Sequence, residues 1–203
     1  MGYYIRILGV KDPDIHIDYL LAPLKKGGLN CKIEYAENER PEQWTVLNIK
    51  NTKGESLVQI ERNVVVEGEL GKDELNEFEE LIGDFKPATA VAWLKAYFVK
   101  VKVIYAFQML NAAFEDANFE IVSSIKATIW NITGGILQAD HEGFSNEDGY
   151  HILWQFSDDV TGEWSCAVQN EEKGWTKFVM QLGDREQRKQ FLNGEVPEKA
   201  ILV

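Results

Sequence analysis

The sequence predicts an α+β protein that consists of two similar βαβββα halves, with mainly antiparallel sheets backed by helices. Short runs in which apolar and polar residues alternate recur between Gly, Pro and Asn, and they indicate strands. Longer segments with apolar residues three and four positions apart indicate helices. A Gly-Gly pair, Gly27-Gly28 in one half and Gly134-Gly135 in the other, stands between a predicted helix and a predicted strand. The chain therefore divides into residues 1–86 and 87–203, as two domains or as halves of one merged domain. A chance recurrence of a common order of elements is the alternative to a duplication.

In the first half, alternation predicts strands at four places, residues 3–10, 31–35, 45–49 and 58–66. A helical stripe at residues 17–24 follows Asp12-Pro13, a pair typical of a helix start, and Pro23 is expected to kink it. A second helix is expected at residues 73–82, where Asp73 can cap its start and Gly83 can end it.

The middle of the chain has the densest apolar and aromatic content. Pro87 opens a short predicted helix that carries Trp93, and from Val99 the apolar period changes from helical to alternating. The β-branched content of residues 99–107 favours a strand. One continuous helix from Pro87 to about Met109 is the alternative, because short periodic segments fit both patterns.

In the second half, a helical stripe runs from about Asn118 to Ile132 and ends at a Gly-Gly pair. Strands are expected at four places, residues 136–139, 150–156, 164–168 and 175–182. Their alternation predicts that three tryptophans face the core, Trp154, Trp164 and Trp175. Asp184 is expected to cap a last polar helix.

Composition limits the classes of function. The chain has 203 residues, of which 45% are hydrophobic, so it can bury a core. Its formal net charge of −12 argues against a nucleic-acid surface, which needs clustered Lys and Arg. Acidity also keeps proteins in solution, but it makes a basic protein the candidate partner. Lys95, Lys100 and Lys102 interrupt the only segment long enough to suggest a membrane helix.

Cysteine usage indicates the compartment. Cys31 and Cys166 lie far apart, with no Cys-x-x-Cys and no disulfide framework, so both are expected to be reduced thiols. The sequence therefore predicts a soluble, cytoplasmic protein. It contains no phosphate-binding loop, no nucleophile motif and no cofactor motif, so no cofactor and no catalytic residue is predicted.

The most unusual stretch is residues 127–172, which contains no Lys or Arg. Nine acids fall within it, Asp140, Glu142, Glu147, Asp148, Asp158, Asp159, Glu163, Glu171 and Glu172. Four side chains of the 140–151 loop, Asp140, Glu142, Asp148 and His151, are the candidate ligands of a metal ion or small molecule. The alternative is a structured hairpin loop whose acids cap turns or face water.

Three functions remain open at this point. The first is a non-enzymatic binding or regulatory protein that acts through an acidic surface. The second is a small-ligand or metal-dependent enzyme with a site near the 140–151 loop. The third is a structural subunit of an oligomer, which would pair through exposed strand edges.

Overall fold

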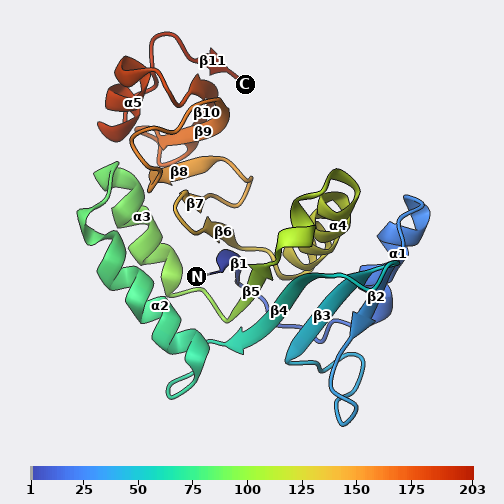
Figure 1. The fold of residues 1–203 in the computed structure, drawn as a ribbon. Helices are drawn as coiled ribbons and strands as arrows, with labels where there is room; N and C mark the ends of the chain where they lie inside the picture. The colour runs from blue at the N-terminus through green and yellow to red at the C-terminus, as the bar shows by residue number, and fades with distance from the viewer. Residues whose placement is uncertain (1) are drawn as a thin grey trace. The chain divides into compact units, whose positions relative to one another are not determined.

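The computed structural model describes residues 2–203 and divides the chain into two compact units, each built from two separate segments (Figure 1). Unit 1 comprises the residues up to Lys72 together with Val101–Gly135, and unit 2 comprises Asp73–Lys100 together with Ile136–Val203. The described residues form a mixed α/β structure with five α-helices and eleven strands, paired mostly in antiparallel fashion. Among these residues, no helix combines the length and the apolar content needed to cross a membrane.

Unit 1 contains an antiparallel sheet of five strands. Their order is β1 (Tyr3–Gly9), β5 (Val103–Met109), β4 (Ser56–Val64), β3 (Val46–Asn51) and β2 (Cys31–Glu34). Strand β5, between β1 and β4, is buried throughout residues 103–107, which explains its continuous apolar sequence. Helix α1 (Ile17–Lys26) packs against α4 (Asp116–Thr133), which also contacts β1 and β4.

Unit 2 contains six strands that follow one another in chain order. They are β6 (Ile136–Ala139), β7 (Gly143–Ser145), β8 (His151–Trp154), β9 (Glu163–Gln169), β10 (Trp175–Gln181) and β11 (Ile201–Leu202). Only β8 and β9 among them pair in parallel, through the single register pair His151 and Cys166. The helices are most of α2 (Leu70–Leu81), α3 (Ala88–Phe98) and α5 (Arg185–Leu192). Phe191 of α5 is buried with Trp154, Cys166 and Phe178 in one core cluster.

The predicted α+β class with mainly antiparallel strands is confirmed, and so is the strand in the ambiguous middle segment. Helix α3 ends at Phe98 and β5 begins at Val103, so no continuous helix runs from Pro87. The duplication is not confirmed. In the second half five strands, β6–β10, stand between α4 and α5, where the first half has only β2–β4 between α1 and α2. In addition, β1 and β5, the first strand of each predicted half, are antiparallel neighbours within unit 1.

Three local predictions differ from the structure. Helix α1 begins at Ile17, where the side chain of His16 accepts from the backbone N–H of Asp18, so Asp12-Pro13 does not open it. Strands β7 and β11 were not predicted, because three and two residues are too few to show alternation. Helix α2 begins at Leu70, so Asp73, which was expected to cap its start, lies within its first turn.

Candidate functional site

The acidic charge is concentrated in unit 2. Unit 2 contains 19 Asp and Glu against 9 Lys and Arg, a formal net charge of −10, whereas unit 1 contains 14 against 12, a net charge of −2. Almost all of the net charge of −12 therefore belongs to the unit that also contains the nine acids of the base-free stretch. A surface that binds a positive partner is therefore expected in unit 2.

The four predicted ligands occupy two separate turns and one strand. Asp140 and Glu142 lie in the turn between β6 and β7, and Asp148 lies in the turn at the other end of β7. The carboxylate of Asp148 is exposed and pairs with the Nζ of Lys177 at 2.8 Å. Within residues 2–203, no group of three or more His, Cys, Asp and Glu side chains is placed to hold a metal ion.

His151 is the fourth predicted ligand and lies in the core of unit 2. Its side chain is 2% exposed, and its ring packs against Phe156 at 4.8 Å and Phe191 at 6.2 Å between centroids. The Nε2 atom is buried without a hydrogen-bond partner. Burial lowers the pKa of His151 to about 3, and a hydrogen bond with the backbone of Leu153 opposes that shift. The imidazole is therefore neutral in neutral solution.

Two polar hollows lie in unit 1, away from these four residues. One has a volume of about 420 Å³ and is lined by both faces of the β2–β3 pair, including Cys31, Lys32 and Lys50. The other, of about 310 Å³, shares Asn51 with the first and reaches Asn118 at the start of α4. The side chains of Asn51 and Asn118 bond within the chain, to Glu55 at 2.7 Å and to the carbonyl of Ala112 at 2.9 Å.

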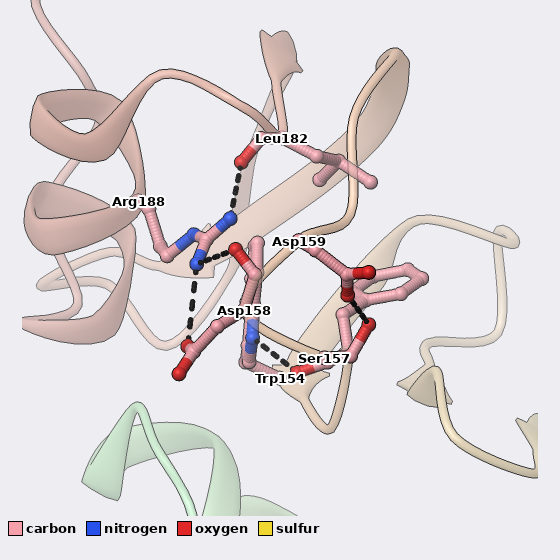
Figure 2. A network of polar contacts seen from close by, with 7 residues as sticks. Trp154, Ser157, Asp158, Asp159, Leu182 and Arg188 are labelled. Atoms are coloured by element: carbon pink, nitrogen blue, oxygen red, sulfur yellow. Dashed lines mark hydrogen bonds and ion pairs between the residues drawn. The ribbon is translucent and has the colours of Figure 1, made fainter.

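The loop between β8 and β9, residues 155–162, is held by one arginine of α5 (Figure 2). Arg188 lies over the ring of Trp154, at 4.9 Å from its centroid, and its side chain is 14% exposed. Its guanidinium donates to the carbonyl oxygens of Asp158 and Leu182, each at 3.0 Å. Helix α5 begins at Arg185 and is capped, as predicted, by Asp184, whose carboxylate accepts from two backbone N–H groups. Arg188 therefore joins α5 to the tip of the loop.

This arrangement presents two carboxylates to solvent. The side chain of Asp158 is fully exposed, and its carboxylate lies 3.4 Å from the guanidinium of Arg188. The hydroxyl of Ser157 donates to Asp159 at 2.6 Å, and this bond is the main cause that lowers the pKa of Asp159 (Figure 2). Asp159 therefore carries its negative charge at neutral pH.

An aromatic residue accompanies these acids. Trp164, predicted to face the core, is 37% exposed, because β8 and β9 share one register pair and the first residues of β9 extend beyond it. Its ring packs edge-to-face on Phe156 at 5.3 Å. The neighbouring Glu163 accepts from the amide of Gln181 at 2.9 Å. We call Asp158, Asp159, Glu163 and Trp164 the acidic-aromatic patch.

These acids lie in the base-free stretch, but the sequence favours the 140–151 loop as the site, because histidines stand beside the acids of that loop. The signal for the patch was an Asp-Asp pair followed after a glycine by Glu163-Trp164. The hydrogen bond from Arg188 to Asp158 joins residues 30 positions apart, so no local sequence pattern predicts it. Comparisons of the chain with family models, curated proteins and solved structures find no match.

Proposed function

We propose that the protein is a non-enzymatic binding protein whose acidic-aromatic patch takes a basic segment of a partner protein. The observation that carries this proposal is the Arg188 clamp, which fixes the backbone of the 155–162 loop while Asp158 and Asp159 stay exposed. A loop that is already ordered loses little conformational freedom when it binds, so more of the contact energy contributes to affinity.

The chemistry of the patch fits Lys or Arg side chains. Carboxylates at Asp158, Asp159 and Glu163 pair with cations, and the exposed part of the Trp164 ring can take a cation on its face. Partly exposed tryptophans supply much of the binding energy at protein interfaces. The net charge of −10 on unit 2 also accelerates the encounter with a positive partner, most strongly at low salt.

The experiment uses a displayed library of Lys- and Arg-rich peptides as the probe. The peptide that binds most tightly is measured by calorimetry at low and at high salt. We expect the triple variant Asp158→Asn/Asp159→Asn/Glu163→Gln to weaken binding about 100-fold, and Trp164→Ala to weaken it about 10-fold.

The matched control is Glu77→Gln/Glu79→Gln/Glu80→Gln, which removes three charges from exposed positions of α2 in the same unit. It should change affinity by no more than about 3-fold, through net charge alone. The proposal is wrong if the control weakens binding as much as the patch variant, if Trp164→Ala has no effect, or if no peptide binds in preference to a neutral one.

A further inference from the structure

The free edge of the unit 1 sheet is β2, the last strand in its order. It has the sequence Cys31-Lys32-Ile33-Glu34 and pairs on one side only, with β3. Residues from both faces of the sheet, Lys32 and Cys31 among them, line the hollow of about 420 Å³ beside it. An edge of this kind offers unpaired backbone donors and acceptors to another strand.

The hydrogen-bond pattern of β3 determines which groups of β2 point outward. The backbone N–H of Asn51 donates to the carbonyl of Glu55, toward β4, so Asn51 does not bond to its register partner Cys31. Backbone groups of successive strand residues point to opposite sides. Cys31 and Ile33 therefore direct their N–H and C=O groups away from the sheet, as does the following Tyr35, while Lys32 and Glu34 bond to β3.

This parity restricts how two copies of β2 can pair about a two-fold axis, because outward-pointing residues must face each other. Three antiparallel registers overlap at least three residues of the 31–35 segment, with the axis at Lys32, at Ile33 or at Glu34. The first places the two copies of Lys32 opposite each other, and the third places the two copies of Glu34 opposite each other. In both registers like charges repel. The second places Ile33 against Ile33, and Lys32 opposite Glu34 of the other copy, twice.

We propose that β2 is a self-association edge, at which two copies of the chain pair antiparallel about Ile33. In this register no like charges lie directly opposite each other, whereas each of the other two creates such a pair. Lys32 and Glu34 project from the same face of the strand and pair within the chain at 2.7 Å, and Glu34 also pairs with Lys50 at 2.7 Å. The proposed contact between copies would add to these ion pairs. The dimer is independent of the acidic-aromatic patch and gives each particle two copies of it.

The interface is short, so the dimer should be weak and dependent on concentration. Each cross-strand pair contributes roughly 0.2–1 kcal/mol, and a segment of four residues offers few of them. Sedimentation velocity over a range of concentrations measures this equilibrium. We expect the protein to shift from monomer to dimer with a midpoint in the micromolar to millimolar range.

Charge exchange tests the register. Lys32→Glu and Glu34→Lys each place like charges opposite each other twice, so each variant alone should stay monomeric. The double variant Lys32→Glu/Glu34→Lys, and an equimolar mixture of the two single variants, should regain the dimer. Thermal melting confirms that each variant folds, and Lys11→Glu, an exposed change just beyond β1 at the other side of the unit 1 sheet, is the matched control.

Cross-linking gives a second readout. In this register Ile33 faces Ile33 in a hydrogen-bonded pair, whose Cα separation of about 5.5 Å suits a disulfide. Ile33→Cys treated with diamide should form a covalent dimer linked through position 33, which mass spectrometry identifies, while the wild type, with Cys31 opposite Tyr35, should not. The proposal is overturned if the wild type stays monomeric at millimolar concentration, if Lys32→Glu dimerises as well as the wild type, or if the cross-link joins positions 31 and 33.

Discussion

Replacement of His151 by leucine should remove a large part of the pH dependence of stability. The imidazole is 2% exposed and lies between the rings of Phe156 and Phe191, and its Nε2 has no hydrogen-bond partner. The titratable group opposite it on β9 is Cys166, whose pKa burial raises to about 12, so this thiol stays neutral below that pH. No charged group among these neighbours can stabilise an imidazolium at this position.

The magnitude follows from linkage. Burial lowers the pKa of His151 from 6.5 to about 3, so between these values the unfolded chain binds a proton that the folded protein does not. The free energy of unfolding is therefore unaffected above about pH 6.5 and falls by about 1.4 kcal/mol for each pH unit below it. At pH 5 the wild type should have lost about 2 kcal/mol through this residue alone.

Urea unfolding at pH 7 and pH 5, followed by tryptophan fluorescence, measures the difference. His151→Leu should show a loss smaller than that of the wild type by about 2 kcal/mol, whatever its stability at pH 7. His141→Asn, at an exposed position with a positive φ that Asn tolerates, is the control and should keep the full loss. Equal losses in His151→Leu and the wild type would refute the argument.

Two further substitutions test the loop and the tight turn of unit 2. Arg188→Met should lower the free energy of unfolding by about 2 kcal/mol and speed hydrogen exchange in residues 155–162, because two carbonyls lose a charged donor. The control Arg185→Met, at an exposed position of the same helix, should lower the free energy of unfolding by less than about 0.5 kcal/mol. Gly143→Ala should cost more than about 3 kcal/mol or prevent folding, because at φ +122° its Cβ would lie 1.9 Å from the carbonyl oxygen of Leu153. The control Gly162→Ala, at φ +105° with open space around it, should lower the free energy of unfolding by only about 1–2 kcal/mol. If Arg185→Met destabilises as much as Arg188→Met, or Gly162→Ala as much as Gly143→Ala, the contact assigned to Arg188 or to Gly143 is contradicted.

Elements that depend on local sequence could be predicted. The Asp184 cap, the strand β5 and the end of α4 at Gly134 follow from side-chain chemistry and periodicity within a few residues. How these elements assemble could not be predicted, because β1 and β5 are paired over about 100 intervening residues and each is apolar enough to join any core.

The Gly-Gly pairs show why the duplication was inferred and why it is not supported. Gly135 has φ +101°, and a Cβ there would lie 2.0 Å from the carbonyl oxygen of Leu8, so glycine is required by the close approach of β1. Gly28 has φ +73°, but no atom lies within 4 Å of a Cβ placed there, so it serves only to end α1. The same dipeptide thus meets two different physical needs, and its recurrence is no evidence of common descent.

The candidate surface was only partly visible in the sequence for a related reason. An acidic stretch indicates where negative charge accumulates. The sequence does not show which carboxylates pair with a basic side chain of the same chain and which stay accessible to a partner. In the structure, Asp148 has Lys177 within 2.8 Å, whereas the fully exposed Asp158 is fixed mainly through its backbone carbonyl, so its carboxylate stays accessible to a partner. That difference arises from α5, which comes two strands after the acidic loop in the sequence. Of its three basic residues, Arg188 is the one that lies over the ring of Trp154. A basic partner that competes for Asp158 need not break the hydrogen bonds that hold the loop, and this is why we favour the acidic-aromatic patch over the 140–151 loop.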